Sequence, residues 1–556
     1  MFVRTQPQAN GKISILIVEN VRESGKVRQK TLRRVATVLP SEVERFKELA
    51  EHIKAEMEIA TEPNLFPATT LAEMVISSRK RSLSDDSPLP VNMRKIREEH
   101  RVVSGIHEIY GSLYDQVGFN RVFNRCPVSR SIMKDLVMAR LCQPCSKRAS
   151  VDLLDRDFGI KIPLEKVYRM MDTLTDERIK KLQRISWDYS RSLLTKEVKI
   201  MFYDCTTLYF ESFTEDELRS FGYSKDHKFN QGQVLLALMV TEEGLPVGYE
   251  VFPGNMYEGD TFKSAIEKIK TRYQVRRAVI VADSGLLSKS NLELLEKENL
   301  DYILGARLKS LSKKWQERIL DNREYEKMNQ EDEMLRISTF AYTKTKRLIV
   351  SHSNKRAEKD SYDREKAVKR LYEKLEKSNN PESLISNYGY RKFLRVEGDV
   401  HVEVDEEKMD KAALWDGLHG VFTNIKEEDM SSEEVLSQYH GLWQVEESFR
   451  ISKHDLRVRP VFHWSADRIK AHLAICFVAF SLIRFLQHHI LKEKQERYSA
   501  ERIRRELYHV QESIVRYTTT GDRYVIPSKP SDEANIIYEA MKMKSHTVPF
   551  KLDSRN

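Results

Sequence analysis

Between residues 198 and 306, short apolar runs alternate with helical patterns in an order that fits few folds. Runs rich in Val, Ile and Leu predict buried strands, and apolar residues spaced three and four apart predict helices. In chain order the expected elements are strands 198–203, 233–241 and 246–252, helix 260–273, strand 277–282, helix 288–298 and strand 302–306. The first three strands suit an antiparallel meander, and the last two need crossover connections. We therefore expect an α/β fold whose mixed five-stranded sheet is flanked by helices.

The length and composition of the chain limit its class. At 556 residues it is expected to hold about three to four domains. A net charge of +9 permits a polyanionic partner without demanding one. Five cysteines, with a single C-x-x-C at Cys142 and Cys145, suit a reducing compartment such as a cytoplasm and no disulfide framework. The most apolar segment, 471–490, contains three histidines and Arg484, so we expect a buried core helix and no membrane span.

The patterns on either side of this region suggest how the rest of the chain is divided. The expected parts are a β hairpin and helix at 1–60, a linker at 61–98, a helical region at 99–195, the two parts of the α/β domain at 196–308 and 431–495, an inserted β-containing subdomain at 309–430, and a C-terminal helix and tail at 496–556. Within 99–195, helices at 150–157 and 164–174 flank a short Gly-containing turn. That outline predicts a helix-turn-helix DNA-binding region, although a small helical bundle has the same pattern.

Three acids could form a site. Asp204 and Asp283 each follow an apolar strand, where sites form in open α/β sheets, although a lone acid there is more often a helix cap. Glu446 lies in the stretch 439–453. If this stretch is one helix, Tyr439, Glu446, Arg450 and Lys453 share a face, and Glu447 points about 100° away. The alternative is that these charged residues form an ordinary solvent-exposed helix face.

Three converging carboxylates repel one another unless cations lie between them. Mg²⁺ prefers oxygen ligands and leaves positions open for water and phosphate. Two such ions about 4 Å apart can activate a nucleophile and stabilise the leaving oxygen of a phosphodiester. The three acids therefore favour metal-dependent chemistry on a phosphodiester.

The residues around these acids resemble a known family. The matching stretches are Tyr203-Asp-Cys-Thr-Thr-Leu, Ala282-Asp-Ser-Gly-Leu-Leu-Ser and the stretch 439–453, which follows the signature Y-x2-R-x3-E-x6-K; 246–255, 459–463 and 469–472 also match. Over roughly residues 100–490 the chain resembles the bacterial insertion-sequence DDE transposases of the YREK-signature subgroup. It departs from the signature at Leu442, which stands where the family has Arg.

The resemblance implies a fold and a set of ligands. The expected core is RNase H-like, with Asp204, Asp283 and Glu446 holding two Mg²⁺ ions for which Mn²⁺ may substitute. In the family an inserted β-containing subdomain separates the second and third acids. Here these acids are 446 − 283 = 163 positions apart, and the interruption at 309–430 lies between them.

The resemblance also implies a reaction and partners. The expected activity is cut-and-paste transposition: the enzyme binds the terminal inverted repeats, cleaves the DNA there and joins the ends to target DNA. Tyr439, Arg450 and Lys453 would contact DNA phosphates, and Trp415 would stack on a base, although an ordinary core tryptophan is the alternative. The implied state is a homodimer in a synaptic complex, acting at the nucleoid.

Three other functions are compatible with parts of this pattern. A related nuclease would use the same metal site without joining DNA ends. A transposase-derived DNA-binding protein would not need three intact acids. A helical interaction protein would use Asp204 and Asp283 as caps. His454 and His463, which flank the signature, are expected to be structural or to contact phosphate.

Overall fold

The computed structural model describes residues 1–9, 11–23, 26–59, 93–194, 200–210, 216, 218–220, 232–271, 278–321, 326–330, 333–377, 393–397, 401–459 and 461–552. Contacts divide the chain into two compact units: Met1–Arg97 with Tyr517–Thr520, and Glu98–Arg516 with Gly521–Asn556. Most of the linker expected at 61–98 lies outside the described residues.

The first unit contains the hairpin expected near the N-terminus. Strands β2 (Ile13–Glu23) and β3 (Lys26–Val38) pair antiparallel, and β1 (Phe2–Pro7) adds a further strand beside β2. The following helix, α1 (Val43–Ile59), buries Ala50 against Ile15 and Val38 of the sheet. The apolar side chains of the helix and of one sheet face therefore form a small core of their own.

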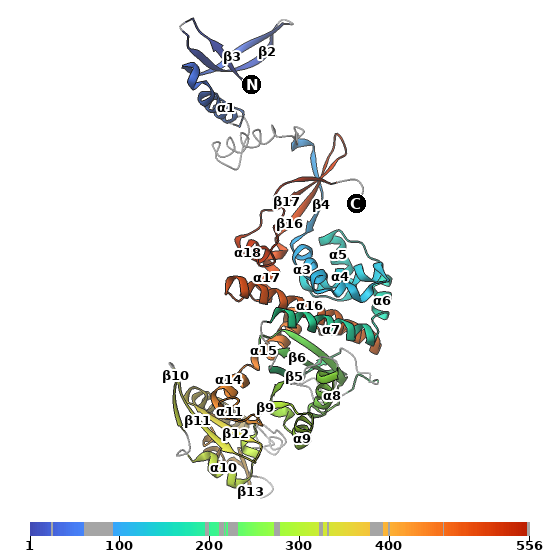
Figure 1. Ribbon diagram of the computed structural model, residues 1–556, viewed down its shortest axis with the longest axis vertical. Coiled ribbons are helices and arrows are strands. Elements are labelled where there is room, and N and C mark those ends of the chain that lie inside the picture. Colours follow the sequence, from blue (N-terminus) through green and yellow to red (C-terminus); the bar gives the residue numbers. More distant parts are fainter. Residues whose placement is uncertain are drawn as a thin grey trace. The chain divides into compact units, whose positions relative to one another are not determined.

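The second unit is built on a large mixed sheet. Among the described residues it has nine strands in the order β10-β11-β12-β15-β9-β8-β5-β6-β7 (Figure 1). The five that precede the insertion are β5 (Ile200–Tyr209), β6 (Gln233–Thr241), β7 (Pro246–Pro253), β8 (Val279–Ala282) and β9 (Asp301–Gly305). β5, β6 and β7 form an antiparallel meander, and β8 and β9 continue parallel to β5. The mixed five-stranded sheet predicted from the sequence is confirmed.

The inserted segment extends the same sheet. Antiparallel pairs link β9 to β15 (Leu418–Thr423), β15 to β12 (Arg347–Ser353), β12 to β11 (Glu333–Ala341) and β11 to β10 (Glu326–Gln330). Leu348, Val350 and Phe422 bury their side chains in the core that also covers β8 and β9. This pairing leaves β9 inside the sheet, so its backbone groups are not exposed as an edge.

The insertion also carries elements outside the large sheet. They are helix α10 (Lys313–Leu320), helix α11 (Asn354–Lys377), the antiparallel pair β13 (Leu394–Glu397) and β14 (His401–Val404), and helix α13 (Glu406–Ala413). On the crossovers of the core lie α8 (Glu258–Thr271) and α9 (Lys289–Lys297), within about two residues of the helices expected there.

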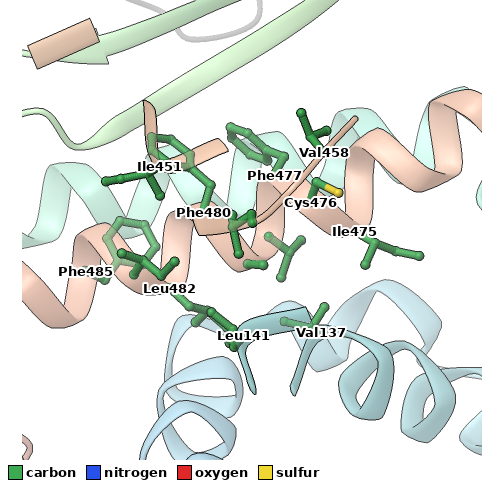
Figure 2. Packing of buried hydrophobic residues seen from close by; sticks show 14 of the residues in the cluster. Val137, Leu141, Ile451, Val458, Ile475, Cys476, Phe477, Phe480, Leu482 and Phe485 are labelled. Carbon is green, nitrogen blue, oxygen red and sulfur yellow. The ribbon is translucent and has the colours of Figure 1, made fainter. Parts of the chain in front are cut away.

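One face of the sheet is covered by helices centred on α16 (Ala466–Lys494). Around it pack α3 (Gly105–Val117), α4 (Pro127–Cys142), α6 (Leu164–Asp172) and α7 (Asp176–Leu193), and α5 (Lys147–Phe158) lies against α4 (Figure 1). Figure 2 shows Phe477 and Phe480 of α16 between the α4 side chains and Ile451 and Val458. The helices of the expected DNA-binding region therefore share one core with the sheet.

The apolar character of α16 is explained by this burial. Within the part of the chain that the structure covers, α16 is the helix long and apolar enough to cross a membrane, but 89% of its apolar window is buried inside the protein. The expectation of a buried core helix is confirmed.

The C-terminal part differs from expectation. Only a helix and a tail were expected at 496–556, but helix α17 (Ala500–Tyr508) is followed by strand β16 (Gln511–Tyr517). β16 pairs with β17 (Arg523–Pro527) in a sheet of order β18-β17-β16-β4, whose outer members are β18 (Phe550–Leu552) and β4 (Ile96–Val103), and α18 (Asp532–Ala540) follows β17. Pairing with distant strands overrides the local helical pattern here.

Candidate active site

Two aspartates lie side by side on neighbouring strands. β5 and β8 are parallel, with Tyr203 opposite Ala282. The next residue on each chain is an aspartate, Asp204 or Asp283, so the two lie one strand spacing apart, about 4.8 Å between backbones. Asp283 directly follows β8, as predicted. Asp204 was predicted to follow its strand, which was wrong: β5 continues to Tyr209 because β6 keeps pairing with it.

Both aspartates face the helical layer. Side chains alternate along a strand, so Asp204 shares a face with Phe202, and Asp283 shares a face with Val281. Phe202 and Val281 belong to the core that contains α16, whereas Tyr203 belongs to the core on the opposite face. The two carboxylates therefore point to one side of the sheet.

Hydrogen bonds orient both carboxylates. Asp204 Oδ1 accepts from the backbone amide of Cys205 at 2.7 Å, and Asp283 Oδ1 accepts from that of Ser284 at 2.6 Å. The hydroxyl of Tyr439 also donates to Asp283 Oδ1, at 3.4 Å. Burial raises the pKa of the Tyr439 phenol, and the neighbouring Asp283 charge raises this pKa further. The phenol therefore stays protonated and acts as a donor.

The stretch 439–453 is not one helix, and this expectation was wrong. α14 (Ser432–His440) ends and α15 (Trp443–Arg450) begins on either side of Gly441 and Leu442. Backbone bonds there join residues three apart, such as the amide of Leu442 to the carbonyl of Tyr439 at 3.1 Å. A Cβ at Gly441 would lie 2.5 Å from Phe202 Cζ, so glycine lets the chain pass close to β5.

Glu446 stands on α15, above the face that holds the two aspartates. Val445 and Phe449 anchor α15 in the core shared with Phe202, and Glu446 itself is exposed. Its charge acts on Tyr439, which places it on the side of the Tyr439–Asp283 contact. Glu447 instead accepts two bonds from Arg450, each 2.6 Å. Of the two neighbouring acids, Glu447 is therefore the one whose carboxylate is held by Arg450.

The structure brings two of the three acids together. Among the residues that the structure describes, no three His, Cys, Asp or Glu side chains gather closely enough to hold a metal ion. Asp204 and Asp283 fit a hard divalent cation by donor type and placement, since carboxylate oxygens are the ligands such ions prefer. Glu446 is also a carboxylate, but its position on α15 is too far from the two aspartates for all three acids to hold one ion.

Arg450 and Lys453, the two cations predicted to contact phosphate, lie at the end of α15 and in the turn that follows it. The guanidinium of Arg450 bonds Glu447 and also lies 3.4 Å from Asp455 Oδ2. Lys453 lies in the π-helical turn Ile451–Asp455, in which the amide of Leu456 bonds the carbonyl of Ile451 at 2.8 Å. A π-helical turn has more residues than an α-helical turn, so side chains after α15 point in other directions than a continuous α-helix would give. Glu446 and Lys453 therefore do not share one face of a regular α-helix.

The inserted subdomain supplies residues that the sequence did not single out. The ring of His419 lies 5.0 Å from that of Tyr439, and burial lowers the pKa of His419 to about 4, helped by the charge of Arg356. His419 and Arg356 line a cavity of about 460 Å³ together with Trp415, Arg307 and Lys309. Arg356 lies in a long charged run, which carried no signal for such a role.

A family model described as a transposase DDE domain matches residues 198–482, more than half of the 556-residue chain. The chain belongs to this family, and its catalytic core is RNase H-like. It is therefore a DNA transposase, and transposases of this family generally use divalent metal ions. No curated protein sequence matches the chain.

Solved transposase structures show only distant similarity. A piggyBac transposase synaptic complex with hairpin DNA is 11% identical, with coverage of 73% of this chain and 76% of that chain and a TM-score of 0.36. The Mos1 paired-end complex with the left transposon end is 11% identical over 46% and 76%, with a TM-score of 0.15. The Mos1 mariner paired-end complex with Mn is 12% identical over 48% and 78%, with a TM-score of 0.14.

Proposed function

We propose that this transposase excises an insertion sequence and joins its ends to target DNA. It would bind the terminal inverted repeats and hydrolyse the phosphodiester at each end, which leaves a 3′-hydroxyl. That hydroxyl oxygen would then attack a target phosphodiester and displace a 3′-oxygen of the target strand. The observation that carries this proposal is the register of β5 and β8, which sets Asp204 and Asp283 side by side on one face.

Each residue has a role in this proposal. Asp204, Asp283 and Glu446 would hold two Mg²⁺ ions, which supply Lewis-acid stabilisation of the phosphodiester when bound. Tyr439 would orient Asp283 through its hydroxyl, as the bond between them supports. Movement of α15 toward β5 would bring Glu446 to the other two acids. Arg450 and Lys453 would contact phosphate, Arg450 by exchanging its carboxylate partners for DNA.

Trp415 is proposed to stack on a base at the DNA end. It lines the cavity that Arg307, Lys309 and Arg356 make positive, so a strand could place a phosphate and a base there together. Stacking on an aromatic side chain contributes roughly 1–3 kcal/mol per base. Two DNA ends would be paired by a homodimer.

The test removes one carboxylate at a time. Asp204→Asn, Asp283→Asn and Glu446→Gln are compared with wild type on linear DNA that carries the inverted repeats flanking the gene, with Mg²⁺ or Mn²⁺. Loss of a metal ligand removes several kcal/mol of transition-state stabilisation, so cleavage should fall about a thousandfold or more. Binding of the same DNA should persist.

The matched control is Glu447→Gln, which removes the neighbouring carboxylate and should leave cleavage nearly intact. Cleavage by Asp204→Asn at the wild-type rate would refute the metal assignment. If wild-type protein cuts DNA but never joins the ends to a target plasmid, the protein is a nuclease. Binding without any cleavage would identify a binding-only descendant.

A further inference from the structure

A second cavity lies away from the three acids. It has a volume of about 340 Å³ and is formed where the N-terminus of α5 meets residues 457–459 and 461–463. Its cationic and imidazole lining is Arg140, Lys147, Arg148, Arg457, Arg459, His463 and His472. None of the described residues that line it is Asp or Glu. The helical region and the segment that follows the signature thus jointly enclose positive charge without a carboxylate in the lining.

Two of these cations are buried. Arg140 and Lys147 are 3% and 4% exposed. Arg140 donates to the backbone carbonyls of Cys145 at 2.9 Å and Leu456 at 3.1 Å, which are neutral acceptors. Burying a charge with no ion partner is costly, and proteins rarely retain one without a use for it.

The hydrogen bonds of Lys147 show how its charge is held. Lys147 Nζ lies 3.2 Å from His472 Nδ1, and His472 Nε2 lies 3.1 Å from the carbonyl of Val458. The carbonyl can only accept, so His472 donates from Nε2 and accepts from Lys147 at Nδ1. Burial keeps the pKa of His472 well below its ordinary value, and burial also lowers the pKa of Lys147 to about 7. An anion in the cavity would provide the missing counter-charge.

The surroundings favour a phosphate group as that anion. Lys147 is the first residue of α5, whose N-terminus carries a partial positive charge. At the rim, Arg457 holds a left-handed backbone conformation, with φ of 43°, and is exposed. The exposed rings of Phe462 and Trp464 follow it, 58% and 68% accessible. Basic and aromatic side chains that alternate on a surface are typical of nucleic-acid binding.

The cavity also lies at a useful distance from the acids. Arg459 stacks over the ring of Tyr209, 5.2 Å from its centroid, at the far end of β5. Tyr209 is five residues beyond Asp204 on this strand, which corresponds to about 17 Å. This separation corresponds to about five nucleotides of a DNA strand.

We propose that this cavity, the phosphate pocket, binds a backbone phosphodiester of the DNA that the transposase cuts. The identity of the ligand rests on the proposed function, whereas the anion site rests on the cavity itself. The pocket would fix the position of the DNA and would not read its sequence.

The first experiment uses inorganic phosphate and the full chain. The melting temperature is measured with rising phosphate against chloride at equal ionic strength. Phosphate should raise the melting temperature of wild type but not of Lys147→Met, which keeps the length of the side chain and removes its charge. Lys166→Met, an exposed lysine on α6, is the matched control and should respond like wild type. Equal responses of wild type and Lys147→Met would overturn the site.

The second experiment identifies the natural ligand. Affinity for duplex DNA is measured against salt in EDTA, so that failure of catalysis does not bear on the result. Loss of one phosphate contact should reduce the magnitude of the slope of log K against log salt by about one in Lys147→Met. Arg457→Asn, exposed and compatible with the left-handed backbone, should give the same change even if Lys147→Met folds poorly. Unchanged slopes would overturn DNA as the ligand, and a response to free phosphate alone would identify a small-anion site.

Discussion

At the scale of the residue, the Tyr439 hydroxyl makes a side-chain contact that ties helix α14 to Asp283. It donates to Asp283 Oδ1 while its ring packs near His419. A Cβ at Gly305 would lie 2.4 Å from this hydroxyl, so a glycine in β9 leaves room for it. The placement of Tyr439 therefore depends on β8, β9 and the inserted β15 together.

Tyr439→Phe tests this contact. The substitution removes one donor to Asp283 and keeps the ring, so stability should change by only about 1 kcal/mol. Loss of a group that orients a metal ligand typically lowers metal affinity or activity about ten- to a hundredfold. The measurement is the Mn²⁺ concentration that gives half-maximal DNA cleavage, which should rise.

Tyr362→Phe serves as the control because Tyr362 is 61% exposed on α11. It should leave the Mn²⁺ dependence unchanged. If Tyr439→Phe behaves in the same way, the hydroxyl does not orient Asp283.

At the scale of the element, the junction between α14 and α15 sets the position of Glu446. Gly441→Ala should disturb it, since the new Cβ would lie 2.5 Å from Phe202 Cζ and 3.0 Å from the carbonyl of Gln438. Overpacking of this kind costs about 1–3 kcal/mol, and the displaced α15 should lower cleavage. Thermal unfolding and cleavage assays measure the two effects.

Phe202→Leu removes the atom that Gly441→Ala would meet. The double variant should therefore be less destabilised than the sum of the single variants, which a double-mutant cycle can measure. Gly111→Ala, in helix α3 beside the flexible end of Lys134, is the matched control and should be neutral or slightly stabilising. Additive effects of Phe202→Leu and Gly441→Ala would count against the proposed close approach.

Sequence patterns predicted the elements that local contacts decide. The five core strands, the helices at 260–273 and 288–298, and buried α16 follow from apolar periodicity and are present. Asp204 was misplaced relative to its strand because β6 continues the pairing through a polar stretch. The break at Gly441 lets the chain pass close to Phe202 of β5, a contact between distant segments that no local pattern reveals.

The acids of the candidate site were predictable from the sequence, whereas the residues that the insertion brings to it were not. Asp204, Asp283 and Glu446 were chosen by chemistry and motif, and register places the two aspartates together. His419 and Arg356 reach the site only because the insertion pairs with β9, a contact between distant segments. The phosphate pocket likewise joins α5 to a segment about 300 residues later in the chain, so neither half suggests it alone.

At the scale of the whole molecule, half-buried histidines that stay neutral in the folded state should make the protein sensitive to acid. Burial lowers the pKa of His419 and of His463 to about 4, from about 6.5 when unfolded. The unfolded chain therefore binds more protons between these values, and stability falls as the pH drops from 6.5 toward 4. The loss by pH 5 should be roughly 1 kcal/mol for each, discounted for partial exposure.

Denaturant unfolding in phosphate-free buffer at pH 7 and pH 5 measures this loss. His419→Gln should reduce the difference between the two values, whereas His509→Gln, at an exposed position, should not. An equal loss in wild type and His419→Gln would assign the acid sensitivity to other groups.

The two ends of the segment 354–416 lie next to each other at the end of β12. The amide of Ser353 at the end of β12 donates to the carbonyl of Gly417 at 3.1 Å, so the segment 354–416 leaves and rejoins the sheet at one point. Closing a longer or shorter excursion between fixed ends changes the free energy only slightly. We therefore expect this segment to tolerate replacement: Arg356 and Trp415 stand at its two ends, so segments from related chains could change the lining of the cavity beside them while Asp204, Asp283 and Glu446 keep their supports.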